Sequence, residues 1–211
     1  MSKRTILITG CSSGIGLATA RLLRDRGWRV LATARKPEDL HRLEHSERLE
    51  AIALELADPS SIAACARETL RRTDGQLMAL FNNAAYGQVG AVEDVSADVL
   101  RRQMEVNFIG THALTCALIP AMRAQGYGRI VNCSSVLGLV TGPFRGAYSA
   151  SKFALEGLTD AMRLELQGSG IHVSLIEPGP IRSQFLDTAL ALFKANIDRQ
   201  ASPHRDRKSV V

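Results

Sequence analysis

The chain has 211 residues, of which 45% are hydrophobic and 22% charged, and its formal net charge is +5. This length suits one domain with a substantial core, and the ordinary composition excludes a disordered or fibrous chain. No stretch approaches the roughly 18 apolar residues of a membrane span, and residues 1–4 lead into an apolar run too short for a signal peptide. The basic residues are scattered along helix-like segments, so we expect solvated faces and no nucleic-acid surface.

Four cysteines, Cys11, Cys65, Cys116 and Cys133, show no metal-ligand spacing among themselves or with histidine. We therefore expect free thiols, no metal site and a reducing, cytoplasmic environment.

Residues 5–9 are predicted to form a buried strand, and residues 17–26 the helix that follows it. Gly10, Gly14 and Gly16 lie between them. A glycine turn that leads into a helix N-terminus directs free backbone amides and the helix dipole at one point, which predicts an anion site. The spacing differs from the common Gly-x-Gly-x-x-Gly pattern, so a plain glycine-rich turn is the alternative.

A second strand over residues 28–33 ends in Ala34-Arg35-Lys36 and lacks the acid that commonly holds the ribose 2′-hydroxyl of NAD. The guanidinium of Arg35 suits a 2′-phosphate, which favours NADP. The alternative is an ordinary surface arginine.

Further strands are expected over residues 49–56, 77–81, 128–135 and 171–177, with helices over 37–48 and 96–125 and a helix that begins at Asp58 and Pro59. Ser96 is the expected N-cap of the long helix, and Leu100, Met104, Ile109, Leu114, Leu118 and Met122 are its expected inward residues. Six strands alternating with five helices predict a single doubly wound α/β domain of Rossmann type, with a parallel sheet in the order 3-2-1-4-5-6.

Three polar positions within these elements leave alternatives open. Asn107 falls in the middle of the long helix, where an asparagine usually points to water. Ser134 and Ser135 point to opposite faces of their strand, so at most one of them faces the crevice at the ends of the strands.

Tyr148 and Lys152 are four residues apart in a segment whose later apolar residues predict a buried helix. At this spacing the two side chains share one helix face. An ammonium beside a phenol favours the phenolate and lowers a pKa that starts near 10, so that the phenol can exchange a proton with a substrate oxygen. The alternative is that both residues merely decorate a helix.

Together these residues resemble the short-chain dehydrogenase/reductase family. Thr9 to Gly16 resembles its Thr-Gly-x-x-x-Gly-x-Gly turn, and residues 82–85 resemble its Asn-Asn-Ala-Gly, with Ala85 in place of glycine. Pro178, Gly179 and Ser183 resemble Pro-Gly-x-x-x-Thr. The end of the second strand is similar to the NADP-preferring branch that includes 17β-hydroxysteroid dehydrogenases, retinol dehydrogenases and bacterial aldehyde reductases.

The resemblance implies an NADP(H)-dependent oxidoreductase that moves hydride between nicotinamide and a carbonyl or alcohol. Tyr148 would exchange the proton and Ser135, thirteen residues earlier, would bind the same oxygen. Lys152 would lower the Tyr148 pKa and hold the nicotinamide ribose, while Asn107 would support a water that links Lys152 to solvent. The implied cofactor-binding residues are Gly10, Ser12, Ser13, Gly14, Ile15, Gly16, Arg35, Glu55, Leu56, Asn83, Ala84, Tyr148, Lys152, Pro178, Gly179, Ile181 and Ser183. A homodimer or homotetramer is also implied.

The C-terminal part departs from the family pattern. Residues 181–197 are expected to form an apolar lid over a greasy substrate such as an aldehyde, ketosteroid or retinal-like compound, with ordinary core packing as the alternative. We expect the catalytic domain to cover residues 1–198 and residues 199–211 to form a frayed, basic tail. The seventh strand that the family has is apparently absent. A nucleotide-binding module without catalysis is therefore the alternative function.

Overall fold

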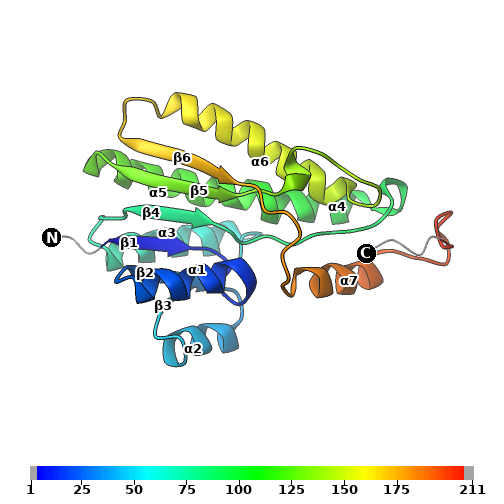
Figure 1. Cartoon of the computed structure of the whole chain (residues 1–211), viewed down its shortest axis with the longest axis horizontal. Helices are drawn as coiled ribbons and strands as arrows, with labels where there is room; N and C mark the ends of the chain where they lie inside the picture. Colours follow the sequence, from blue (N-terminus) through cyan, green and yellow to red (C-terminus); the bar gives the residue numbers. More distant parts are fainter. Residues whose placement is uncertain (1–3, 207–211) are drawn as a thin grey trace.

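A computed structural model describes residues 4–206 of the chain and shows one parallel six-stranded sheet between two layers of helices (Figure 1). The strands are β1 (Thr5–Ile8), β2 (Arg29–Ala34), β3 (Glu50–Ala53), β4 (Ala79–Asn82), β5 (Gly128–Cys133) and β6 (Ile171–Ile176). Their order is β3-β2-β1-β4-β5-β6, which confirms the predicted topology.

The helices are α1 (Gly14–Asp25), α2 (Pro37–His45), α3 (Pro59–Arg72), α4 (Ala97–Met104), α5 (Gly110–Gln125), α6 (Gly146–Glu165) and α7 (Phe185–Asn196). Short turns η1 (Val92–Asp94) and η3 (Val136–Gly138) precede α4 and α6, and η2 (Glu105–Ile109) joins α4 to α5. Strand residues alternate between two cores. Leu7 packs with α3, α5 and α6 on one face, whereas Ile6 and Ile8 pack with α1 and α2 on the other.

The long helix predicted over residues 96–125 is interrupted by the wide π turn η2. Its cap is as predicted, since Ser96 accepts a hydrogen bond from the amide of Val99. The inward positions are partly wrong, because Leu100 and Ile109 are 39% and 45% exposed. A π turn contains an extra residue, so one 3.6-residue period cannot describe the helix on both sides of it.

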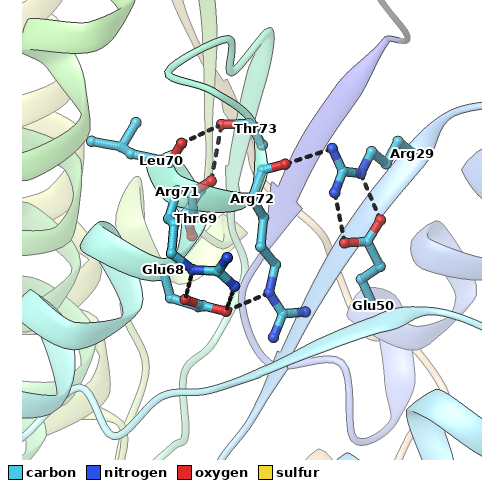
Figure 2. Close-up of polar contacts among 8 residues, drawn as sticks. All are labelled: Arg29, Glu50, Glu68, Thr69, Leu70, Arg71, Arg72 and Thr73. Atoms are coloured by element: carbon cyan, nitrogen blue, oxygen red, sulfur yellow. Dashed lines mark hydrogen bonds and ion pairs between the residues drawn. The ribbon is translucent and has the colours of Figure 1, made fainter.

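An arginine–carboxylate network joins the beginnings of β2 and β3 to the end of α3 (Figure 2). Arg29 contacts Glu50 through two hydrogen bonds of 2.6 and 2.9 Å and donates a third, of 2.7 Å, to the carbonyl of Arg72. Glu68 accepts from both Arg71 and Arg72. The network lies at the amino ends of the strands. It therefore stabilises the sheet on the side opposite to the carboxyl ends of the strands.

The segment after α7 is folded as far as it is described. Ser202 is buried and donates to Asp94 at 2.6 Å, and His204 contacts Glu93 at 2.7 Å. The expectation of a frayed tail is therefore wrong for residues 199–206, because polar contacts with η1 hold them; residues 207–211 lie outside the described part.

The expectations about cysteines, membrane spans and metal sites concern the described residues. All four cysteines are free thiols, three of them buried. Among residues 4–206 no helix combines the length and apolar character that crossing a bilayer requires, and no cluster of metal-ligating side chains is found.

Candidate active site

The glycine turn connects the end of β1 to the beginning of α1. Gly10 and Gly14 have φ angles of +71° and +57°, which other residues rarely adopt. A Cβ at Gly10 would lie 2.8 Å from the Cα of Ala84, so the backbones approach too closely for a side chain. The turn thus presents backbone at the amino end of α1, as phosphate groups require. These residues fit a dinucleotide.

Asn83 fastens this turn to the end of β4. Its side-chain amide donates to the carbonyls of Thr9 and Gly10 at 2.9 and 3.2 Å. In return, the hydroxyl of Thr9 accepts from the amides of Asn83 and Ala84, each at 2.9 Å. Thr9 is not among the predicted site residues, although it is the first residue of the motif that resembles the family's glycine turn.

Arg35 and Glu55 follow β2 and β3 and form an ion pair at 3.3 Å. The guanidinium is largely exposed and lies beyond Thr33, whose side chain and carbonyl accept from the amides of Gly10 and Cys11. Arg35 is therefore near the glycine turn and available to an anion that displaces the carboxylate. The side chain of Leu56 is buried in the core.

Tyr148, Ser135 and Lys152 meet at the opposite side of the same crevice. Tyr148 and Lys152 lie on α6, and the ammonium nitrogen is 5.7 Å from the centroid of the phenol ring. Ser135, just after β5, forms a hydrogen bond with Tyr148 and accepts another from the amide of Leu137 at 3.1 Å. Of the two serines that alternate at this strand end, Ser135 is the one bonded to the phenol.

Lys152 is almost fully buried and donates to the carbonyl of Cys133 at 2.7 Å. Burial lowers its pKa to about 8, while Cys133 and Glu156 act in the opposite direction. An ammonium inside a protein loses hydration, which disfavours its charged form.

Tyr148 departs from the expectation of an acidified phenol. Burial raises its pKa to about 12, and the hydrogen bond with Ser135 opposes this shift. The expected lowering by Lys152 does not decide this pKa: loss of hydration around the phenolate is the largest cause of the shift, and Ser135, not Lys152, is the group that opposes it.

Asn107 does not point to water, so that interpretation is wrong. It is buried in the π turn η2, where its carbonyl oxygen accepts from the amide of Tyr86 at 3.1 Å. Its amide donates to the carbonyl of Tyr86 at 2.8 Å and to the hydroxyl of Ser151 at 3.1 Å. Asn107 thereby ties the loop after β4 to α6, one residue from Lys152.

A cavity of about 640 Å³ opens between these groups and α7. Of the predicted site residues, its lining includes Ile15, Asn83, Ser135, Tyr148, Lys152, Pro178, Gly179 and Ile181. Phe185, Leu186 and Ala189 of α7 also line it, and the ring of Phe185 lies edge-on to that of Tyr148 at 5.4 Å. The expected apolar lid is thus present beside the phenol; in Figure 1 the strand arrows point towards α7.

The remaining predicted residues do not line this cavity. Ser12, Ser13 and Gly16 belong to the glycine turn and the beginning of α1, and Ser183 lies 3.5 Å from where a Gly14 Cβ would stand. Arg42 was missed: it donates to the carbonyl of Ser12 at 2.6 Å from α2, thirty residues away. A surface arginine in a helix gives no sequence signal for such a contact.

Comparisons with known proteins agree with this geometry. Residues 4–191 match the family model described as short chain dehydrogenase. The chain is 49% identical over 185 residues to the uncharacterized oxidoreductase YbbO of Escherichia coli, covering 88% of this chain and 68% of the relative. It is 39% identical to human 17-beta-hydroxysteroid dehydrogenase type 1, covering 94% and 63%. It thus spans about two thirds of the length of these two relatives.

A solved structure of a metagenomic short-chain oxidoreductase in complex with NADP superposes with a TM-score of 0.79 at 35% identity. The superposition covers 86% of this chain and 83% of that one.

Proposed function

The chain belongs to the short-chain dehydrogenase/reductase family, and from this premise we propose that it is an NADP(H)-dependent oxidoreductase acting on an apolar carbonyl or alcohol. The observation that carries the proposal is the meeting of Ser135, Tyr148 and Lys152 at a cavity that continues to Ile15 and Asn83, beside the glycine turn. Proton donor and cofactor cradle therefore share one space.

The nicotinamide would supply or accept a hydride at the substrate carbon. Tyr148 is the proton carrier, since it lines the cavity and forms a hydrogen bond with Ser135. Ser135 orients the substrate oxygen and withdraws charge from it. Lys152 holds a positive charge beside the phenol and also offers a donor to a ribose hydroxyl.

The phenol is protonated near neutral pH, because its pKa is about 12. The phenol therefore carries the proton that carbonyl reduction needs. Alcohol oxidation needs the phenolate, and the positive charge of an oxidised nicotinamide beside it would favour that form.

Support for NADP comes from Arg35, since strand β2 ends without an acid that would repel a 2′-phosphate. Glu55 is the group that the phosphate must displace, at an exposed position where ion pairs are weak. Support for an apolar substrate comes from α7, whose Phe185, Leu186 and Ala189 line the cavity.

We propose self-association through the side formed by α4, η2 and α6. Ile109, Phe153 and Leu164 are large apolar residues there that are 45%, 46% and 67% exposed. Sedimentation analysis of the wild-type chain should show a dimer or tetramer that Phe153→Glu dissociates; monomeric wild type would contradict it.

Turnover tests the proposed activity. With NADPH and a panel of aldehydes, ketosteroids and retinal, the wild-type chain should oxidise the cofactor. Tyr148→Phe should lose at least 99% of this rate, since general acid catalysis contributes about 10²–10⁴-fold. The variant should still bind NADPH. Tyr127→Phe, at a half-buried tyrosine that donates a hydrogen bond to Gln76 outside the site, is the matched control. Cofactor binding without turnover across the panel would instead support a binding module.

A further inference from the structure

We propose that Arg42 is a positioning residue for the cofactor, which holds the glycine turn in the shape that receives the phosphates. This inference rests on the proposed function, because it concerns the affinity of the same site. It assigns a role to a residue on α2, outside the turn and outside the cavity lining.

Arg42 reaches the turn at its middle. One nitrogen of its guanidinium, Nη2, donates to the carbonyl of Ser12 at 2.6 Å and to the carboxylate of Asp39 at 2.7 Å. Ser12 lies between Gly10 and Gly14, the two residues of the turn with positive φ. The contact therefore acts where the backbone has the most freedom to rotate.

The direction of the Ser12 carbonyl decides what the turn offers to an anion. In a planar trans peptide, the carbonyl of Ser12 and the amide of Ser13 point in opposite directions. Because the Ser12 carbonyl points towards Arg42, the Ser13 amide points in the opposite direction. The partial negative charge of the carbonyl oxygen is thereby kept away from the phosphates. Without this donor the peptide could rotate and present its oxygen to the anion.

The other contacts of the turn leave this peptide unsecured. The amides of Gly10 and Cys11 are held by Thr33 of β2, at 3.3 and 2.8 Å. Ser13, the N-cap of α1, makes no side-chain capping bond. Arg42 supplies the missing restraint for the second half of the turn.

The side chain of Arg42 and the helix that carries it are themselves held in place. Asp39, one helical turn earlier, orients the guanidinium, and the pair is only partly exposed. Glu47, just after α2, binds Arg21 and Arg24 of α1. Helix α2 is thereby fastened to α1 as well as to the turn, so that Arg42 acts from a rigid support.

Binding measurements separate this role from direct phosphate recognition. In calorimetry, Arg42→Met should raise the Kd for NADP⁺ and for NAD⁺ by the same factor, roughly tenfold, the loss of one charge-assisted hydrogen bond. Arg42→Lys keeps a donor, so its Kd values should lie between those of the wild type and those of Arg42→Met. Arg71→Met is the matched control, because Arg71 forms the same i,i+3 pair with Glu68 far from the turn (Figure 2).

Hydrogen exchange of the protein without cofactor gives a second readout. The amides of residues 12–16 should exchange faster in Arg42→Met than in the wild type or in Arg71→Met. If Arg42→Met does not fold, Asp39→Asn, which removes the carboxylate that orients Arg42, is measured in the same way and should show the same faster exchange.

Two results would overturn the inference: unchanged affinities and exchange in the Arg42 or Asp39 variants, or a loss confined to NADP⁺, which would make Arg42 a ligand of the 2′-phosphate. Wild-type protein that binds neither cofactor would overturn the proposed function itself and this inference with it. Binding in the wild type with no effect of Arg42 leaves the proposed function intact.

Discussion

The ammonium of Lys152 donates a 2.7 Å hydrogen bond to the carbonyl of Cys133 within the crevice, almost entirely out of contact with solvent. The ammonium of Lys152 thus lies in a buried environment, where the loss of hydration disfavours its charged form. Burial brings its pKa from 10.5 down to about 8, so its charge state changes within an accessible pH range.

This shift predicts a specific dependence of stability on pH. Between the folded pKa of about 8 and the unfolded value of 10.5, the unfolded chain binds more protons, so stability rises with pH in this window. From pH 8 to 9.5, Lys152 should contribute a gain on the order of 1–2 kcal/mol in the free energy of unfolding. In urea titrations, the free energy of unfolding of the wild type and of Lys194→Met, at an exposed lysine, should rise with pH relative to that of Lys152→Met. The buried thiols of Cys11, Cys65 and Cys133, whose pKa values are raised, act in the opposite direction, but they are common to all three proteins. Equal gains in both variants would refute the shift.

Ser135 should set the pH dependence of alcohol oxidation. Oxidation requires the phenolate of Tyr148, and the hydrogen bond with Ser135 lowers the pKa of that phenol. Ser135→Ala should therefore move the alkaline rise of kcat/KM upward by about one pH unit, the equivalent of a hydrogen bond of about 1.4 kcal/mol. Ser134→Ala, in the adjacent position, should leave the apparent pKa at the wild-type value. The reverse pattern would reassign the roles of the two serines.

Arg35 and Glu55 should act on cofactor choice in opposite directions. Arg35→Asp replaces the cation with a charge that repels a 2′-phosphate, so the Kd for NADP⁺ should rise roughly tenfold while that for NAD⁺ changes little. Glu55→Gln removes the competing partner of Arg35 and should tighten NADP⁺ binding about two- to fivefold, an effect that weakens with added salt. Fluorescence titrations at two ionic strengths measure both. An unchanged NADP preference in Arg35→Asp would count against this assignment.

Gly10 should be intolerant of a side chain for a reason beyond its φ angle. At Gly75, with a φ of +72°, a Cβ would meet nothing within 4 Å, whereas at Gly10 it would lie 2.8 Å from Ala84. Gly75→Ala should thus cost only the backbone strain, about 1 kcal/mol. Gly10→Ala should cost about 1–3 kcal/mol more, since the close-packed backbone of Ala84 must shift, and should also weaken cofactor binding. Chemical denaturation compares the two, and equal costs would show that the close approach is unimportant.

The sheet order could be predicted because each strand is apolar and each crossover has helical periodicity. The buried β1 and the Asp58 cap of α3, which accepts from the amide of Ser60, follow from local residue preferences. The pairing of Tyr148 with Lys152 follows from their four-residue helical spacing. Ser135 is assigned to the same site only through the family pattern, since a residue thirteen positions earlier, on another element, carries no local signal.

The errors have a common physical origin in tertiary contacts. For Asn107, the alternative of a side chain in water came from helix propensity, which says nothing about the loop that packs against it. The pKa of Tyr148 depends on its burial in the folded chain. The contact of Arg42 with Ser12 depends on the packing of α2 beside the glycine turn. Such effects depend on which elements become neighbours.

The π turn at Asn107 makes this part of the chain sensitive to its own length. Removing one residue between Glu105 and Ile109 would restore an ordinary helix, and by the criterion of backbone hydrogen bonding alone the chain would be improved. However, it would rotate one flank by about 100° about the helix axis and carry Asn107 away from Tyr86 and Ser151. The contacts of Asn107 therefore depend on the π turn. A chain shortened by one residue would have more regular helix geometry but would be the less functional protein.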